Sequence, residues 1–251
     1  MSASGLEHYL AEFNRVEAAL PGRRVGWLAH ARRQALDHFA QAGFPTLRQE
    51  DWKYTSVAAL EKSRFAVALP QAGDGLDAAV AAQIEALALA GAHLLVFVNG
   101  AHQPQWSRIG ALPVGLELAS LAATLDRAPD CLEGLLTRRA SDYPSGFASG
   151  FAALNMAFMT DGAYIRVAAG TVTVQPIHLL FLATAGELAT HARNLVVAQA
   201  AAESASSSTT RAWMGWAIAR IPSLTSLPSA MRRSNITSCS RRASRPSISP
   251  A

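Results

Sequence analysis

Residues 151–184 decide the fold, and their sequence is FAALNMAFMTDGAYIRVAAGTVTVQPIHLLFLAT. A short apolar segment breaks at Asp161-Gly162, and runs rich in Val, Ile and Thr follow, separated by Gly170 and Pro176. Runs of four to six such residues, cut by Gly and Pro, are typical of strands joined by tight turns. We therefore expect strands at 164–167, 171–174, 177–182 and 194–198.

The chain before residue 90 has a helical pattern instead. Apolar residues three and four apart predict an amphipathic helix over 6–20 that Pro21-Gly22 stops. A second helix is expected over 25–42 before Gly43, and an Ala-rich helix over 74–90. In the second helix the spacing points Trp27, Leu28, Ala31, Ala35 and Phe39 inward, and Arg32, Arg33 and Asp37 outward.

Between these regions the sequence predicts a hairpin and short helices. The apolar run 94–98 predicts a buried strand, and Asn99-Gly100 is the strongest hairpin signal in the chain. We expect the return strand at 103–107 and short helices at 116–125 and 130–137. In the connector 44–60 we expect Trp52, Tyr54 and Leu60 to be buried anchors, although the two aromatic rings could instead form a patch that faces a partner.

Composition narrows the class of protein. No apolar run in the 251 residues reaches the roughly 18–20 residues that a membrane-spanning helix needs. The N-terminal MSASGLEHYLAEF carries acids and no basic region before an apolar one, which is not the pattern of a secretory signal. Cys131 and Cys239 are too few and too isolated for a disulfide framework or a metal site. We expect a cytoplasmic protein with no membrane partner.

The net charge of +4 comes from the C-terminal segment. Residues 201–251 hold seven arginines and one acid, which leaves 15 basic against 17 acidic residues in 1–200. Single-stranded nucleic-acid binders interleave basic residues with stacking aromatic ones. In this segment only Trp213 and Trp216 are aromatic, and they lie near Arg211 and Arg220 alone. We therefore expect no nucleic-acid partner.

Several motifs in a fixed order carry a resemblance to a known family. They are QEDWKYT at 49–55, LLVFVNG at 94–100, SLAATL at 120–125, FAALNMAF at 151–158, the strand stretch 161–184, and HARNLVVA at 191–198. Over roughly residues 1–200 the chain resembles the SufB/SufD family of the SUF iron–sulfur cluster assembly system, and within it SufD more closely than SufB.

The resemblance implies a fold and partners. It implies an α+β chain in which an N-terminal helical region is followed by a right-handed parallel β-helix, here truncated after its first rungs. It also implies a non-catalytic scaffold that pairs with a SufB-like paralogue and a SufC-like ATPase, in a complex that handles a transient iron–sulfur cluster. The family segment that binds SufC has no counterpart in this sequence. We accordingly divide the chain into 1–145 (mainly helical), 146–200 (start of the β-helix core) and 201–251 (a Ser- and Arg-rich tail).

The tail loses the periodic apolar pattern, which favours disorder. A second hypothesis is a frameshift in the gene near residues 198–205. Codons for 205–217 can be chosen so that an offset frame encodes Ile-Val-Glu-His-Tyr-Ala-Gly-Leu-Asp-Gly-Leu-Gly. In the same offset, codons for 233–240 can encode Ile-Glu-His-Tyr-Lys-Leu-Gln. Both strings resemble β-helix segments of the SufD family, in family order.

No catalytic, cofactor-binding or metal residue can be assigned from the sequence. The chain lacks the GxxxxGK[ST] phosphate loop, so it is not the ATPase, and it lacks GxGxxG and CxxC. We expect His178 to be a hydrogen-bonded core or edge histidine rather than a ligand, and Cys131 to be a small packed apolar residue. Glu50 and Asp51, beside Arg48 and Lys53, suggest a solvated, charge-balanced face rather than paired catalytic carboxylates.

An enzyme built on a β-helix, acting on carbohydrate or acyl groups, is the competing hypothesis. Such an enzyme needs carboxylates or a histidine gathered on successive rungs. The sequence offers only Asp161, Glu187, His178 and His191, which are scattered. The hexapeptide repeat of left-handed acyltransferase helices is also missing, so we expect no enzymatic activity.

Overall fold

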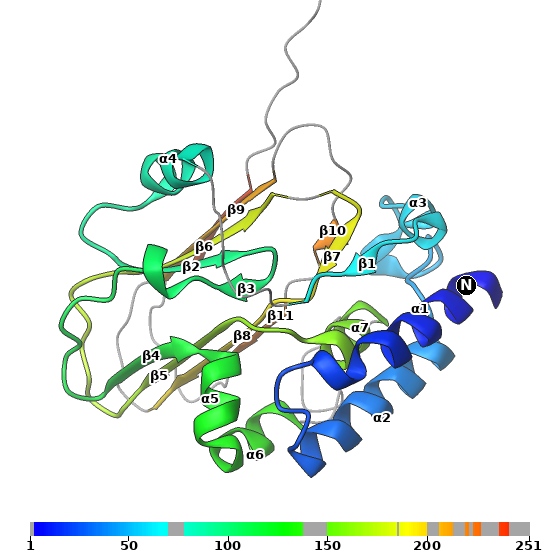
Figure 1. Cartoon of the computed structure of the whole chain (residues 1–251), viewed down its shortest axis with the longest axis horizontal. Helices are drawn as coiled ribbons and strands as arrows, with labels where there is room; N and C mark the ends of the chain where they lie inside the picture. Colours follow the sequence, from blue (N-terminus) through cyan, green and yellow to red (C-terminus); the bar gives the residue numbers. More distant parts are fainter. Residues whose placement is uncertain are drawn as a thin grey trace, which may run out of the picture.

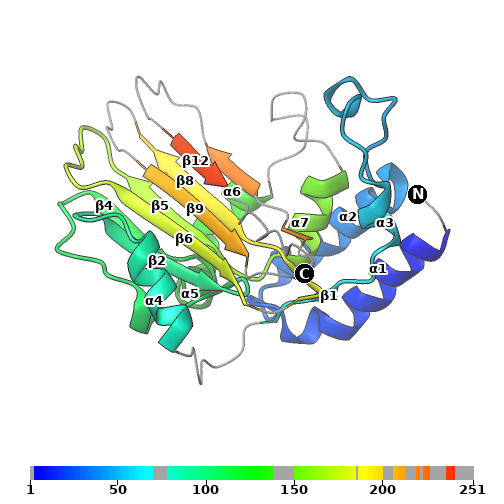
Figure 2. The ribbon, with the colours of Figure 1, turned by 90° about the horizontal axis from the view of Figure 1, so that it is seen from above.

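A computed structural model describes residues 3–69, 78–137, 150–184, 186–199, 206–212, 219–220, 223–226 and 236–240. Helices α1, α2 and α7 gather at one end of the molecule, whereas α4 and α5 lie against the strands, as Figures 1 and 2 show. The structure is therefore mixed α+β, as expected.

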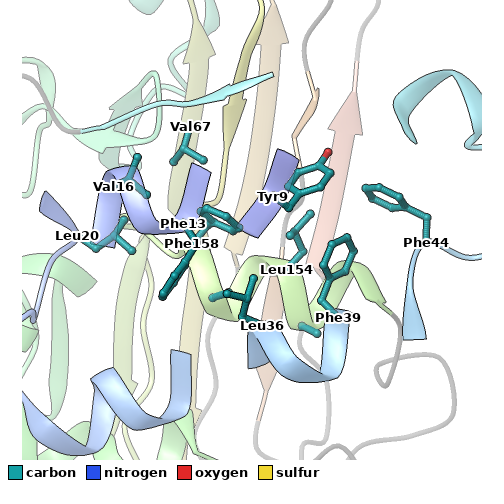
Figure 3. Close-up of a cluster of buried hydrophobic side chains, with 12 residues drawn as sticks. Tyr9, Phe13, Val16, Leu20, Leu36, Phe39, Phe44, Val67, Leu154 and Phe158 are labelled. Atoms are coloured by element: carbon teal, nitrogen blue, oxygen red, sulfur yellow. The ribbon is translucent and has the colours of Figure 1, made fainter. Parts of the chain in front are cut away.

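Three helices form the helical layer. They are α1 (Ala3–Val16), which continues into η1 (Glu17–Ala19), α2 (Gly26–Ala42) and α7 (Gly150–Phe158). Their apolar faces meet in an aromatic core in which the rings of Tyr9 and Phe39 lie 5.4 Å apart, edge to face (Figure 3). The helices predicted over 6–20 and 25–42 are confirmed. The shorter helices are η2 (Glu50–Trp52), α3 (Ala58–Lys62), α4 (Ala78–Leu87), η3 (Pro104–Trp106), α5 (Leu121–Arg127), η4 (Pro129–Leu132) and α6 (Glu133–Leu136).

The strands belong to three sheets. In one sheet the order is β1-β7-β10, in the second β11-β8-β5-β4, and in the third β12-β9-β6-β2-β3. Their bounds are β1 Ala66–Val67, β2 His93–Val98, β3 Ala101–His102, β4 Leu116–Ser120, β5 Ala163–Val167, β6 Ile177–Ala183, β7 Leu188–Thr190, β8 Arg193–Ala198, β9 Ser206–Ala212, β10 Ala219–Arg220, β11 Ser223–Ser226 and β12 Ile236–Ser240.

From β5 onward the chain moves through the three sheets in turn. β5, β6 and β7 each enter a different sheet, and β8, β9 and β10 pair parallel to them in the same order. β11 and β12 then pair parallel to β8 and β9. Ile177 is in register with Ser206, and Ser206 with Ile236, so the chain returns to the same sheet after about 30 residues.

Strands from the first half of the chain close one edge of this arrangement. β1 pairs parallel with β7, β2 pairs parallel with β6, and β4 pairs antiparallel with β5. Elements on both sides of residue 145 therefore share all three sheets. Residue 145 itself lies outside the described residues, and the division into three domains stays a prediction.

Two apolar clusters stabilise the sheets. The first lies between β2 and β6 on one side and β4 and β5 on the other, and includes Phe97, Ile165, Leu179 and Phe181. The second lies under α4, where Ile84 packs on the opposite faces of β2 and β6. Because both of its faces are covered, β2 is buried along its whole length, which agrees with the continuous apolar run 94–98.

Three local predictions are wrong. Residues 116–120 form strand β4, because every second residue is buried and the segment pairs with β5; only the part from Leu121 is helical. The predicted return strand 103–107 is limited to β3 at 101–102, because Pro104 opens the 3₁₀ turn η3. Residues 171–174 form no strand, and Val172 and Val174 are 57% and 93% exposed.

The hairpin prediction at Asn99-Gly100 is confirmed. Asn99 has φ 49° and Gly100 has φ 83°, the positive values that a type I′ turn requires, and β2 pairs antiparallel with β3 across it. By contrast, the strands β9 to β12 lie in a segment whose composition predicted no regular structure. The Thr residues of β9, β11 and β12 and Ile236 favour extended chain, and each of the four strands pairs parallel with a strand that precedes it in the sequence.

Candidate functional site

Buried polar side chains gather where helix α7 meets the corner between β7 and β8. Arg32 comes from α2, Asn155 from α7, and His191 and Arg193 from the corner or the start of β8; each is less than 9% exposed. Buried polar groups are costly unless they are hydrogen-bonded. The partners of these side chains therefore indicate what the cluster does.

Arg32 joins three helical elements. Its Nη1 donates to the main-chain oxygen of Ala157 in the last turn of α7 (2.9 Å), and its Nη2 donates to the oxygen of Pro21 after η1 (3.0 Å). A cation near the carboxyl end of a helix is favourable because the helix dipole is negative there. Burial, and secondarily the nearby Arg193, lowers the pKa of Arg32 to about 10, so the side chain stays charged at neutral pH.

The outward position predicted for Arg32 is wrong. The side chain is 3% exposed, because it follows Leu28 and precedes Leu36 by one helical turn each and so shares their buried face. Its neighbour Arg33 is exposed, as predicted, and pairs with Glu17 at 2.9 Å.

Asn155 links α7 to the first residues of β8. Its Nδ2 donates to the oxygen of Ala192 (3.0 Å), and its Oδ1 accepts from Nη1 of Arg193 (3.3 Å). Both groups of the amide are thus used in holding the helix against the strand. No sequence motif predicted this role for Asn155, whose one signal is a single amide inside the otherwise apolar helix FAALNMAF.

His191 is fully enclosed and stacks on Phe158, with the ring centroids 5.2 Å apart. Neither ring nitrogen has a hydrogen-bond partner among the described residues. Burial, with a smaller contribution from Arg32, lowers the pKa of His191 to about 3. The ring is therefore neutral at physiological pH and acts as a packed aromatic side chain.

Glu12 holds strand β1 against helix α1. Its carboxylate accepts from the main-chain nitrogen of Val67 (2.6 Å) and from Arg15 (2.8 and 2.6 Å). The hydrogen bonds from Arg15 hold the pKa of Glu12 below its ordinary value, although burial acts in the opposite direction. The signal in the sequence is one acid among Tyr9, Phe13 and Val16 on the apolar face of α1.

The cluster of Arg32, Asn155, His191 and Arg193 is one centre of hydrogen bonding, and the carboxylate of Asp161 is the second. Its Oδ1 accepts from Ser120 Oγ (2.8 Å) and from the main-chain nitrogens of Ala122 and Gly162 (3.0 and 2.7 Å), and its Oδ2 accepts from the nitrogen of His102 (3.0 Å). Burial raises the pKa of Asp161, and the four hydrogen bonds counteract that rise. One carboxylate thus joins β3, the start of α5 and the start of β5.

A serine and a histidine lie beside this centre. Ser107 Oγ is 3.0 Å from His102 Nε2 but also 2.8 Å from the oxygen of Gln103, and it accepts from the nitrogen of Val96 (3.0 Å). The hydroxyl has one proton, so its bond to Gln103 competes with a bond to the imidazole. Asp161 bonds the main chain of His102 rather than its ring, so the relay of a catalytic triad is not formed.

The residues weighed for an enzyme are not brought into one pocket. His178 lies in β6 under α4, where its Nδ1 accepts from the nitrogen of Leu89 (3.2 Å), in agreement with the predicted hydrogen-bonded core histidine. Glu187 is exposed in a turn with φ 55°. The main chain next to Asp161 lies close to that of His191, because the nitrogen of Thr160 donates to the oxygen of His191 (3.3 Å). In the described structure, however, no hydrogen bond joins the side chains of Asp161 and His191.

Two further predictions need correction. Cys131 is exposed rather than packed, because in the 3₁₀ turn η4 it is Leu132 that faces the core; its thiol donates to the oxygen of Ala128 (3.0 Å). Tyr54 is 89% exposed and is not an anchor, whereas Trp52 is half-buried against the ring of Phe151 at 5.3 Å. Glu50 is exposed, as predicted for a solvated face; the side chain of Asp51 lies outside the described residues.

The described residues were also compared with the requirements of a metal site and of a membrane-spanning helix. Among the described residues, no three His, Cys, Asp or Glu side chains come together as a metal site. No helix in the described ranges is both long and apolar enough to cross a membrane. An open hollow of about 590 Å³ lies between the 18–25 loop and the end of α5, and it contains none of the polar residues of the two centres.

Comparisons with known proteins show the family of this chain. Residues 3–179 match the family model described as the SufBD protein N-terminal region. The chain belongs to the SufBD family. It is 30% identical over 168 residues to an iron–sulfur cluster assembly SufBD family protein of Synechocystis sp. (strain PCC 6803). That match covers 66% of this chain and 35% of the relative, so the chain spans about a third of the length of the curated relative.

The two polar centres of this SufBD chain lie within the matched region or directly after it. The first centre joins α2 and α7 to the start of β8, and Glu12 separately joins α1 to β1. Their donors and acceptors are directed at one another and at the main chain. Such an arrangement positions the strands relative to the helical layer.

Proposed function

We propose that this chain is a SufD-type scaffold subunit that acts in iron–sulfur cluster assembly with a SufB-like paralogue and a SufC-like ATPase. The observation that carries the proposal is the match of residues 3–179 to the SufBD N-terminal region, together with the relative named as an iron–sulfur cluster assembly protein. The cluster is cargo of the complex, and the chain holds no cofactor of its own. The subunit works in the cytoplasm without a nucleic-acid or membrane partner.

We infer further that the three sheets are the first turns of a right-handed parallel β-helix. Two observations support this: successive strands enter the three sheets in a fixed order, and parallel partners are about 30 residues apart. In such a solenoid each turn buries its face on the next. The strands β1, β2 and β4 would then close the first turn.

The scaffold is not an enzyme in this proposal. The polar residues that could serve chemistry are bonded to the main chain, as Asp161 is, or enclosed, as His191 is. A β-helix enzyme would need carboxylates together on successive turns. Asp161, Glu187 and His178 instead lie in three separate places.

We also propose that the reading frame changes near residues 198–205, which impairs the scaffold. The strand register supports this, because the residues of β9 that pair with apolar residues of β6 carry hydroxyl groups. Leu179 is in register with Ser208 and Phe181 with Thr210. Sequencing the gene tests the idea: the codons for 233–240, read in the offset frame, should encode Ile-Glu-His-Tyr-Lys-Leu-Gln. Any other peptide contradicts the frameshift without touching the family assignment.

Affinity capture tests the partners. The chain as it stands and a version with the offset frame restored after residue 198 are each mixed with purified SufB and SufC homologues. We expect the restored chain to retain both proteins and the present chain to retain no SufC. Failure of the restored chain to bind either homologue would overturn the proposed scaffold role. Capture of SufC by the present chain would contradict its impairment.

A further inference from the structure

Two neighbouring loops carry a group of exposed apolar side chains. In the described structure seven large apolar side chains are at least 40% exposed, and four of them belong to the loops 109–115, before β4, and 168–176, between β5 and β6: Ile109, Val114, Val172 and Val174. Val114 and Val174 are the most exposed of the four, at 98% and 93%. One exposed apolar side chain is normal on a protein surface, whereas a contiguous group of them marks an interaction site.

The two loops lie side by side at the end of the molecule away from α1, α2 and α7 (Figures 1 and 2). The main-chain nitrogen of Ala168 donates to the oxygen of Gly115 (2.8 Å). A Cβ added at Gly115 would overlap Oγ1 of Thr171, and one added at Gly110 would lie 3.9 Å from Oε1 of Gln175. Each of the four apolar residues is next in sequence to one of these contacting residues. They therefore form one surface, which we call the loop patch.

The loop patch carries no charge of its own. Neither loop contains Asp, Glu, Lys, Arg or His. The charged residues that flank the loops are joined in ion pairs, Arg108 to Glu85 at 3.1 Å and Arg166 to Glu117 at 2.7 Å. A partner that brought a net charge to this surface would bury that charge unpaired, which is unfavourable. The patch therefore fits an apolar surface whose neighbouring charges are neutralised in the same way.

A second copy of the chain offers such a surface, and a lipid membrane does not. Segments that bind the membrane interface carry aromatic rings and free basic side chains beside their apolar ones. The two loops contain no Phe, Tyr or Trp, and the flanking Arg108 and Arg166 are held by carboxylates. In a two-fold symmetric pair the same surface of both copies meets, so apolar side chains face apolar side chains and no unpaired charge is buried.

We propose that the loop patch is a self-association surface through which two copies of this chain form a two-fold symmetric dimer. Four side chains of this size bury on the order of a few hundred Å² per copy, less than the ~800 Å² per partner of a standard interface. The dimer is therefore weak, with a dissociation constant in the micromolar range. It is a contact between copies of this chain and does not depend on the contacts with SufB and SufC homologues proposed above.

Analytical ultracentrifugation of the full chain over a hundredfold range of concentration tests the dimer. We expect a reversible monomer–dimer equilibrium. Val114→Asp with Val174→Asp places like charges in the loop patch of both copies, so the dissociation constant should rise at least tenfold. Leu47→Asp with Tyr54→Asp is the matched control, because both residues are exposed on another loop, at 53% and 89%; its effect should stay under twofold. A chain that is monomeric at every concentration, or equal effects of the two double variants, overturns the proposal.

A mixing experiment distinguishes a second copy from any other partner. Val114→Lys with Val174→Lys should by itself weaken the dimer at least tenfold, because identical copies then repel each other. An equimolar mixture of this variant with the corresponding double Asp variant should form dimers at least as tight as those of the wild type. A mixture that stays monomeric overturns the proposal. So does binding of the wild type, but not of the double Asp variant, to phosphatidylcholine–phosphatidylserine vesicles, which would show a lipid contact instead.

Circular dichroism checks that each variant is folded, as expected for substitutions at exposed positions. If a charged variant fails to fold, Val174→Thr keeps the shape of the side chain and adds a hydroxyl group. We expect this variant to weaken the dimer severalfold, and an unchanged dissociation constant would contradict the loop patch as the contact.

Discussion

Arg32 donates a hydrogen bond from Nη1 to the main-chain oxygen of Ala157, 2.9 Å away and 125 residues later in the chain. The bond ties α2 to the last turn of α7, and both helices belong to the helical layer. Strand β5 follows α7 directly in the chain. The bond therefore holds α2 and α7 together at the point where the chain leaves the helical layer. The first prediction follows from it.

Replacing Arg32 by alanine should lower the free energy of unfolding by about 2–4 kcal/mol. The change leaves the oxygens of Ala157 and Pro21 without their charged donor and removes buried packing. Urea denaturation followed by circular dichroism measures the loss. Arg33→Ala, which removes an exposed ion pair on the same helix, should cost about 1 kcal/mol or less. Similar costs for the two variants would contradict the role given to Arg32.

Asp161→Asn should destabilise the protein by about 2–4 kcal/mol. The amide replaces one acceptor oxygen by a donor, which then faces the donors from Ser120, Ala122 or His102. Thermal melting gives the size of the loss, and Asp37→Asn on the exposed face of α2 is the control, expected within about 0.5 kcal/mol of the wild type. A wild-type melting temperature for Asp161→Asn would show that the four bonds contribute little.

Stability should fall as the pH decreases below about 6.5, with His191 as one cause. Its pKa is about 3 in the folded chain, whereas the ordinary value is 6.5. Between these two values the unfolded chain binds a proton that the folded chain excludes. Stability is therefore lost at up to about 1.4 kcal/mol per pH unit. His191→Phe should remove this contribution, and His30→Phe, at an exposed position, should not. Unfolding curves at pH 7, 6, 5 and 4 compare the slopes, and equal slopes in all three proteins would refute the assignment.

Gly162→Ala should destabilise the chain by about 3 kcal/mol or more. Gly162 has φ 152°, and an added Cβ would lie 1.9 Å from the main-chain oxygen of Arg193, so β5 and β8 would be forced apart. Gly134→Ala in α6 is the matched control, because its Cβ meets nothing within 4 Å. We expect that control to be neutral or to gain about 0.5–1 kcal/mol in urea denaturation. A Gly162→Ala protein as stable as the control would contradict the close approach of the strands.

Local patterns predicted many elements, because each depends on residues that are near in sequence. The three- and four-residue spacing predicted α1 and α2, and Asn99-Gly100 predicted the β2–β3 turn. Predictions failed where a distant segment decided the outcome. Leu116–Ser120 became a strand because β5 offers it an edge. Arg32 shares the buried face of Leu28 and Leu36 on α2, and only the fold supplies the carbonyl groups of two other elements that bind its charge.

The sequence by itself determined helices α1 and α2, the buried strands β2 and β6 and the turn at Asn99-Gly100, and the order of its motifs indicated the SufB/SufD family. Tertiary structure alone decided the partners of each strand: β6 meets β2 rather than the neighbouring 171–174 segment, and Asp161 meets Ser120 and His102. The physical reason is that main-chain hydrogen bonds and buried polar groups need partners of any sequence separation. Asp161 illustrates both contributions. The sequence showed that the apolar segment ends at Asp161-Gly162, and only the folded chain brought four hydrogen-bond donors to the Asp161 carboxylate.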